Sequence, residues 1–482
     1  VSYGVHVYAR DRDPGFQQAT SLYHPDTVER SLKHDGSGTE PGLKDDEGKW
    51  DLRPHASRIQ HVDLTTLGTW HAVLEADDVP VGQSRMVYTV NRSTAAVLDK
   101  LAAAPRIGDL GLSFSPGWHE KNDRTKGYFD AEWGVPESWD SVILQGPHLH
   151  VANPFYKQPN PTMLHNQDWT AVDLEALPPD AIPATSYKPR GDRAKYDAAY
   201  THWQTEPEGS AGPSTDFYRI AWRRMAANTG ERTLTPALIP PGPAHINGVH
   251  TVGGARGGYA ELVLAAASMG SLLGDCGVRT TPKSEILFSV VQRLPLAADD
   301  RLNNWLLLRA LRLNCVTSEY AQLWADCYTP DFGLDRWTSI ESRTSVDLGH
   351  PESSWSSATP LRRAYDRRHA AVEIDALVAL ALEVSIGELC SVYRTQFPVL
   401  GGYDRGQYAF DANGRLVPSA ILSAARRAKH DLSTEDRSAR HSGSQIVYVY
   451  EPPFVFLDRE DDLRDAYAEF ERRLASKAEK TP

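Results

Sequence analysis

Cysteine is scarce in this sequence. Four occur in 482 residues, at positions 276, 315, 327 and 390. None forms a C-x-x-C pair and none lies near histidine at zinc-finger spacing, so the sequence predicts no zinc site. A few scattered thiols in a chain of this length are typical of a reducing compartment, and we expect a cytoplasmic location.

Targeting and membrane segments are also lacking. No basic stretch followed by an apolar stretch stands near the start, as a secretory signal peptide requires. The longest apolar run, residues 262–273, is interrupted by Ser268, Gly270 and Ser271 and is too short to span a bilayer. We therefore expect no membrane association. Because the first residue is Val1 and not Met, we also expect that the chain is a piece of a longer protein.

The sequence also lacks an excess of positive charge. The chain has 51 Lys and Arg against 63 Asp and Glu, a formal net charge of −12. This charge counts against a protein whose whole surface binds DNA, because phosphate contacts supply most non-specific affinity. Local basic clusters remain, and each is equally compatible with a solvated helix or strand face. They are Arg219, Arg223, Arg224 and Arg232; Arg362, Arg363, Arg367 and Arg368; and Arg426, Arg427 and Lys429.

The remaining composition describes a folded chain. Hydrophobic residues make up 41% of it, and 482 residues suggest two to four domains. The pattern along the chain predicts an α+β fold, in which a β-rich mixed module precedes a mostly helical C-terminal region. We expect four parts: an N-terminal segment (1–90), the β-rich module (91–298), a helical domain (299–430), and a linker, strand and final helix (431–482).

Several local elements follow from periodicity and capping signals. A helix is expected from Ser93 or Thr94 through Ala104, and another from Thr359-Pro360 to about Leu382. Strands are expected at 86–90, 142–144, 149–152 and 286–291, and helices at 259–273 and 388–397. Leu463, Tyr467, Phe470 and Leu474 indicate a final amphipathic helix.

The stretch from 217 to 245 predicts a β-hairpin. Asn228 and Gly230 suit a turn, and residues 233–239 form the expected return strand. In the first strand Arg219 and Arg223 have one parity and the apolar residues the other, so the arginines should face outward, about 13 Å apart. Such a ribbon could contact phosphates and base edges. The pattern alone favours an ordinary half-buried hairpin with solvated arginines.

One sequence resembles a catalytic motif. Asn153-Pro154-Phe155-Tyr156 is similar to the Asn-Pro-Pro-aromatic motif of amino-methyltransferases, which holds an amine with the Asn side chain and stacks the base on the aromatic ring. Phe replaces the second Pro, however, and no glycine-rich cofactor loop precedes the motif. A strand that ends in a turn is the favoured interpretation, and we predict no catalytic residue.

Three further motifs favour structural interpretations. The glycine-rich run 253–258, with Arg256, lacks phosphate-loop spacing and is expected to be a turn, although Arg256 could contact a DNA phosphate. Pro25-Asp26 with Glu47 imitates a nuclease site, but Glu47 lies in a polar run that does not suit a core strand. His148 and His150 could share a strand face, yet no carboxylate follows within 151–157, and two satisfied histidines are favoured over a metal pair.

Five segments in a fixed order resemble a known family. The order is similar to that of the C-terminal half of type IIG restriction–modification enzymes and of related adenine-specific methylases of BREX and DISARM phage-defence systems, which carries a TaqI-like target recognition domain. The resemblance covers roughly residues 90–415, and the five together are more specific than any one alone. The segments are Val142–Lys157, Tyr218–Gly242, Tyr259–Arg279 with Leu294–Leu296 after it, Arg309–Trp324, and Arg367–Pro398.

The resemblance implies sequence-specific recognition of double-stranded DNA. A separate methylase domain, expected upstream in the same polypeptide, would flip an adenine and methylate N6 with S-adenosylmethionine. This chain itself would then hold no cofactor and no metal, and other subunits of a defence system are possible partners. The residues expected at the DNA are Lys157, Arg219, Arg223, Arg224, Asn228, Arg232, Arg256 and Arg279. Arg279 matches a recurrent arginine after the apolar helix of this family.

Two other functions stay open at this point. Tryptophans at 118, 133, 139 and 169, the carboxylates Glu132 and Glu137, and net acidity would suit a carbohydrate-active hydrolase. A protein-binding scaffold of a defence complex is the non-enzymatic alternative. Salt-dependent duplex binding, glycan cleavage and partner co-purification would distinguish the three.

Overall fold

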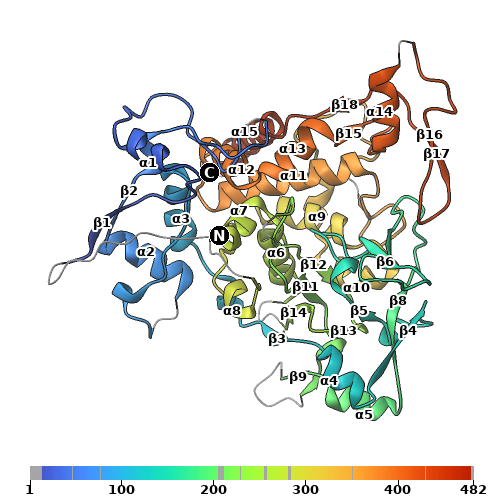
Figure 1. The fold of residues 1–482 in the computed structure, drawn as a ribbon. Helices are drawn as coiled ribbons and strands as arrows, with labels where there is room; N and C mark the ends of the chain where they lie inside the picture. Colours follow the sequence, from blue (N-terminus) through green and yellow to red (C-terminus); the bar gives the residue numbers. More distant parts are fainter. Residues whose placement is uncertain are drawn as a thin grey trace.

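The computed structural model describes residues 13–45, 47–75, 78–204, 211–227, 229–254, 258–280, 284–349, 351–428 and 430–478. It shows the α+β fold that the sequence predicts, with small separate sheets and a helical C-terminal region (Figure 1). The largest sheet lies in the middle of the molecule. Most helices lie on its upper side in this view.

The central sheet has four antiparallel strands in the order β12-β11-β14-β3. They are β3 (Ser113–Ser115), β11 (Arg219–Arg223), β12 (Ala237–Ile239) and β14 (Val249–Gly253). Arg219 pairs with Ile239 and Ala221 with Ala237, so the predicted hairpin is confirmed. Because β11 lies between β12 and β14 and four of its five residues are buried, the hairpin belongs to the core and not to the surface.

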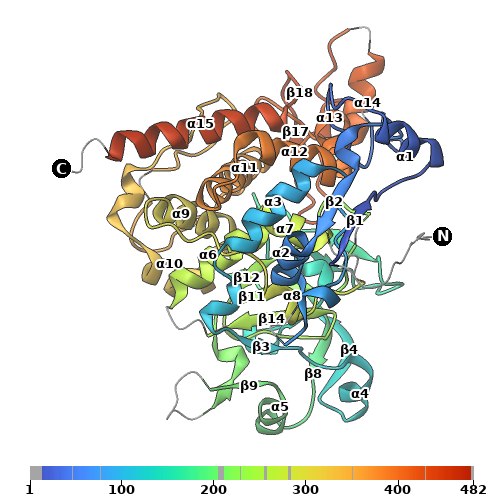
Figure 2. The same cartoon turned by 90° about the vertical axis from the view of Figure 1, so that its left-hand side faces the viewer.

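Helices cover the sheet in layers. The helix α6 packs on β11 and β12, α9 packs on α6, and α11 packs on both α9 and α15. Figures 1 and 2 both show α11 and α15 side by side. The bounds are α6 (Tyr259–Gly270), α7 (Leu272–Arg279), α8 (Phe288–Val291), α9 (Asn303–Asn314), α10 (Ala321–Cys327), α11 (Ala364–Ala381), α12 (Ile386–Gln396), α13 (Pro398–Gly406) and α15 (Arg459–Ala478).

Short strand pairs surround this body. Next to the central sheet lie α4 (Glu120–Thr125), β4 (Phe129–Gly134), β5 (Ile143–Leu144), β6 (Lys157–Pro159), β7 (Trp169–Ala171), β8 (Thr185–Pro189), α5 (Arg193–Ala199), β9 (His202–Trp203), β10 (Gly212–Pro213) and β13 (Ala244–His245). The N-terminal part contains β1 (Gly15–Gln18), α1 (Pro25–Leu32), β2 (Gln60–Asp63), α2 (Leu64–Leu74) and α3 (Arg92–Ala103). The C-terminal projection contains β15 (Ala409–Phe410), α14 (Ser419–Arg427), β16 (Ser438–Arg440), β17 (Val447–Val449) and β18 (Val455–Phe456).

One main hydrophobic core runs through the molecule. It includes Val62 near the start of the described chain and Phe470 near its end, with residues of the expected β-rich and helical parts between them. A second cluster, around Trp118 and Phe129, lies under β4 and β8, and a third, around Ile421 and Tyr450, fills the C-terminal projection. The expected division into four parts stays a prediction.

Several local expectations were wrong. Residues 288–291 form a helical turn where a strand was expected: the Gln292 amide donates to Phe288 O, four residues earlier, at 2.9 Å. Residues 86–90 form no strand, and neither do 149–152, where Ala152 has a φ of 49°. The helix expected from Thr359 begins at Ala364.

Other expectations were confirmed with small shifts. The helix α3 is capped by Asn91, whose side chain accepts a bond from the Thr94 amide. The expected helix at 259–273 is divided at Ser271 into α6 and α7. Among the described residues no single helix is long and apolar enough to cross a bilayer; α6 and α7 pass that test only together, bent by 62°, and their residues are mostly buried.

Candidate nucleic-acid interface

Arg219 lies inside the protein. Its side chain is fully buried, and it donates from Nε to Phe217 O (3.2 Å) and from Nη2 to Pro243 O (2.5 Å). The expectation that Arg219 faces outward is therefore wrong. Alternation places Arg219 and Arg223 on the second face of β11, and other segments cover that face. One of them contributes the Trp203 ring, which lies against Gly253 beside Arg219. Burial lowers the Arg219 pKa to about 10, although the nearby Tyr200 raises it.

Arg223 and Arg224 bind loop carbonyls. Arg223 donates from Nε to Gly146 O (2.8 Å) and from Nη2 to Leu149 O, and burial lowers its pKa. Arg224 donates to Asn247 O (3.3 Å) and pairs with Glu285 Oε1 at 2.5 Å. Both side chains are half-buried. These two guanidinium groups therefore fix the backbone of two loops, one at 146–149 and the other at Asn247.

Arg232 and Arg279 share one buried carboxylate. Arg232 Nε lies 2.8 Å from Asp275 Oδ2, and Arg279 Nε lies 3.3 Å from Asp275 Oδ1. The two arginine side chains are 10% and 7% exposed, and that of Asp275 is not exposed at all. Arg279 also donates to the carbonyls of Gly230 and Glu231, at 3.1 Å each. This network attaches the hairpin turn to α7.

The other residues expected at DNA differ in position. Lys157 begins β6 and is half-exposed, with Nζ 5.1 Å from the centroid of the Tyr156 ring. Asn228 and Arg256 lie outside the described residues, as does Lys429 of the third basic cluster. In the second basic cluster, Arg367 donates to the carbonyls of Leu313, Leu361 and Ala152 at 2.8 to 2.9 Å.

Sequence reasoning missed a polar cluster beside the hairpin turn. Glu231 Oε1 lies 3.2 Å from His150 Nε2, and Glu231 Oε2 accepts a bond from the Tyr408 hydroxyl at 2.7 Å. The rings of His150 and Tyr156 are 4.6 Å apart. Burial alone would raise the Glu231 pKa, but the bonds from His150 and Tyr408 lower it to about 2. Since these residues are far apart in the chain, no sequence signal joined them.

In the described part of the chain, the methyltransferase-like motif and the two histidines make internal contacts. Asn153 Oδ1 accepts the Phe155 amide at 3.0 Å, which is the turn that the favoured interpretation expected. His148 is buried and its ring nitrogens contact Gln145 O and Ala184 O; burial lowers its pKa to about 4. No group of three or more potential metal ligands gathers among the residues that the structure covers.

The carboxylates of the alternative functions are surface groups. Glu47 pairs with Lys49 at 2.6 Å, and its side chain is 72% exposed. Glu132 pairs with Lys188 at 3.1 Å with 58% of its side chain exposed, and Glu137 is exposed. Neither the nuclease motif nor the paired carboxylates of a hydrolase is therefore held in a buried catalytic arrangement.

The five segments of the resemblance pack directly on one another. Each is joined to another by at least one hydrogen bond or ion pair between buried or half-buried groups. The bonds are Arg223 Nε to Gly146 O (2.8 Å), Arg232 Nε to Asp275 Oδ2 (2.8 Å), the Leu238 amide to Asn314 Oδ1 (2.9 Å), and Arg367 Nη2 to Ala152 O (2.8 Å). A comparison with protein-family models and a search of curated proteins both found no match for this chain.

Proposed function

We propose that this chain recognises double-stranded DNA for an N6-adenine methyltransferase of the type IIG, BREX or DISARM kind. The observation that supports this best is the direct packing of the five segments of the resemblance into one unit. Segments separated by up to 215 residues meet there through named bonds, as Arg367 and Ala152 do. S-adenosylmethionine would serve the methylase domain, and this chain would supply recognition only.

The internal bonds of the arginines change how recognition would work. Arg223, Arg232 and Arg279 donate hydrogen bonds to internal carbonyls and to Asp275. A guanidinium bound in this way is not available to phosphate, so the hairpin arginines would hold loops in place and leave DNA contact to the loops themselves. Replacing one of these arginines would then lower the stability of the protein more directly than its affinity for DNA.

The surface proposed to contact DNA consists of the loops that these arginines hold. It includes the hairpin turn at Gly230, the half-exposed Lys157 and the adjacent ring of Tyr156. A lysine beside an aromatic ring provides a phosphate contact next to a stacking surface. In a chain of net charge −12, such a local site is the form that nucleic-acid binding would take.

Fluorescence anisotropy with labelled duplexes tests this proposal. Lys157→Gln should weaken binding to all sequences alike and reduce the salt slope by about 1, because one phosphate contact is lost. The matched control is Lys121→Gln, an exposed lysine on α4. Equal affinities for the wild type, Lys157→Gln and Lys121→Gln would count against this surface.

A protein-binding role is the second candidate, because apolar side chains are exposed in the N-terminal part. Tyr23 and Trp50 stack at 4.0 Å and are 43% and 49% exposed, and Lys44 Nζ lies 3.3 Å from the centroid of the Trp50 ring. Exposed aromatic pairs of this kind are typical of protein interfaces. Retention of a partner by the wild type but not by Trp50→Ser, without any DNA affinity, would favour this role.

A further inference from the structure

A cavity lies between the loop that follows β7 and the tip of the β16–β17 hairpin. Its volume is about 310 Å³, and it opens to solvent. Binding sites for small molecules begin at about this size and are mostly apolar, with a few polar groups that orient the ligand. The apolar residues that line this cavity include Phe155, Val172, Ala176, Leu177, Ala181 and Ile182, and the polar ones are Gln158, Asp173 and Ser444.

Bonds to other parts of the protein hold the walls of the cavity in place. Arg362, from the second basic cluster, donates from Nη1 to Leu174 O at 2.8 Å and to Leu177 O at 3.1 Å. At the hairpin tip, Gly443 lies so close to the end of β7 that an added Cβ would clash with Ala171 O. The cavity is therefore formed before a ligand binds, which lowers the entropic cost of binding.

Asp173 places a carboxylate in the wall of this cavity, with only 8% of its side chain exposed. Its Oδ2 accepts the hydroxyls of Ser444 at 2.6 Å and Tyr448 at 2.9 Å. Its Oδ1 accepts the Glu175 amide at 3.1 Å. Burial alone would raise the Asp173 pKa, but the bonds from the two hydroxyls lower it, so the carboxylate is ionised at neutral pH.

No lysine or arginine nitrogen of the described chain lies within 4 Å of this carboxylate. Among the described residues its one ion-pair contact is with His441, whose Nδ1 lies 3.9 Å from Asp173 Oδ2. That nitrogen accepts the Gly443 amide at 3.1 Å, so in the neutral ring it carries no proton. Arg415 is bonded to Glu175 instead, through Nε at 2.9 Å and Nη2 at 2.8 Å. A recessed charge that is bonded only to neutral donors favours a cationic ligand.

We propose that this cavity binds a small organic ammonium ion, with its nitrogen at Asp173 and its apolar body against the loop 172–182. An ammonium group has up to three N–H donors; the carboxylate accepts one of them strongly, and the amide oxygen of Gln158 is a further acceptor in the same cavity. Because Asp173 is recessed, a small molecule reaches it more readily than a protein surface does. The site goes beyond DNA recognition, since a carboxylate repels the phosphates of nucleic acid.

Calorimetric titration of the full chain with phenethylamine and with phenethyl alcohol tests the site, because the two probes match in size and differ in charge. The wild type should bind the amine about tenfold more tightly than the alcohol, the effect of a charge-assisted hydrogen bond in place of a neutral one. Asp173→Asn should abolish this preference and leave the affinity for the alcohol unchanged, which damage to the fold would not do. Asp180→Asn is the matched control, because Asp180 is an exposed carboxylate on the same loop.

A second variant, Ala176→Leu, narrows the apolar part of the cavity and should weaken the binding of both probes by the same factor, with an unchanged circular dichroism spectrum. The proposal is overturned if neither probe binds, if the wild type binds the amine no better than the alcohol, or if Asp173→Asn keeps the preference. It is also overturned if Asp180→Asn loses the preference as fully as Asp173→Asn, or if Ala176→Leu binds both probes as the wild type does, because the amine would then bind elsewhere.

Discussion

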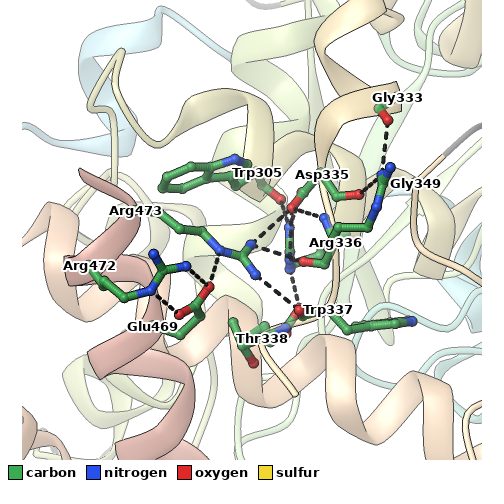
Figure 3. A network of polar contacts seen from close by, with 12 residues as sticks. Trp305, Gly333, Asp335, Arg336, Trp337, Thr338, Gly349, Glu469, Arg472 and Arg473 are labelled. Atoms are coloured by element: carbon green, nitrogen blue, oxygen red, sulfur yellow. Dashed lines mark hydrogen bonds and ion pairs between the residues drawn. The ribbon is translucent and has the colours of Figure 1, made fainter. Parts of the chain in front are cut away.

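A buried ion-pair network joins the C-terminal helix to the rest of the helical region. Arg309 Nε lies 2.5 Å from Glu373 Oε2, and Arg309 Nη1 lies 2.5 Å from Asp335 Oδ2. Figure 3 shows Arg473 of α15 reaching the same Asp335, at 3.3 Å. The carboxyl of Glu373 also accepts the Thr338 amide at 2.6 Å. We predict that Glu373→Gln strongly destabilises the protein while leaving its shape unchanged.

The size of the effect follows from burial. The side chains of Arg309 and Glu373 are both fully buried. Breaking a buried ion pair from one side costs about 3–5 kcal/mol, because an uncompensated charge remains inside. The retained Asp335 and the amide of the glutamine place the expected loss near the lower end, at about 3 kcal/mol.

The pH dependence of stability reports on the same carboxylate. Burial alone would raise the Glu373 pKa, but Arg309 and His369 lower it from 4.5 to about 2. Because the folded pKa lies below the unfolded one, the carboxylate stabilises the protein above pH 4.5 and loses that effect as the pH falls towards 2.

Urea unfolding followed by tryptophan fluorescence and circular dichroism measures the effect. The difference in free energy of unfolding between the wild type and Glu373→Gln should be constant from pH 7 to pH 5 and should shrink below pH 4.5. Glu469→Gln is the matched control: Glu469 pairs with Arg472 and Arg473 near the surface and should cost at most about 1 kcal/mol. A Glu373→Gln loss no larger than that of the control would refute the reasoning.

Three further predictions concern the arginine-held loops and the buried histidine. Asp275→Asn should cost about 3–5 kcal/mol in chemical unfolding, because Arg232 and Arg279 both lose their carboxylate; a loss below about 1 kcal/mol would contradict the network. Gly242 has a φ of +105°, and a Cβ there would lie 2.9 Å from Trp139, so Gly242→Ala should lower stability by roughly 1–3 kcal/mol, whereas Ala at the open Gly402 should not. Burial lowers the His148 pKa from 6.5 to about 4, so the neutral ring stabilises the protein above pH 6.5 and that stabilisation is lost as the pH falls towards 4. His148→Gln should therefore flatten the pH dependence of the free energy of unfolding between pH 6.5 and pH 4. An unchanged slope would exclude His148 as its origin.

Elements with a strong local signal could be predicted from the sequence. The hairpin of β11 and β12 follows from alternation and a turn, and α15 follows from apolar residues at helical spacing. The segment 288–291 could not be assigned in this way, because the apolar residues Phe288, Val290 and Val291 fit a short strand and a helical turn equally. The structure shows the helical turn, in which the Gln292 amide donates to Phe288 O.

The environment of the arginines could not be predicted. Alternation correctly placed Arg219 opposite the apolar residues of β11, but it could not show that other segments cover that second face. The partners of Arg223 are backbone carbonyls of Gly146 and Leu149, which no residue pattern encodes. The role of Asp275 likewise depends on the packing of α7 against the hairpin turn, which brings its carboxylate to Arg232 and Arg279.

The salt dependence of duplex binding by the whole chain tests the central proposal most directly. Dissociation constants would be measured by anisotropy for one duplex from 50 to 200 mM salt. If the loops held by the buried arginines contact phosphates, log Kd should rise linearly with log salt concentration, with a slope of about 0.9 per phosphate contacted. A slope of zero, or no binding at 50 mM salt, would contradict DNA recognition by this chain.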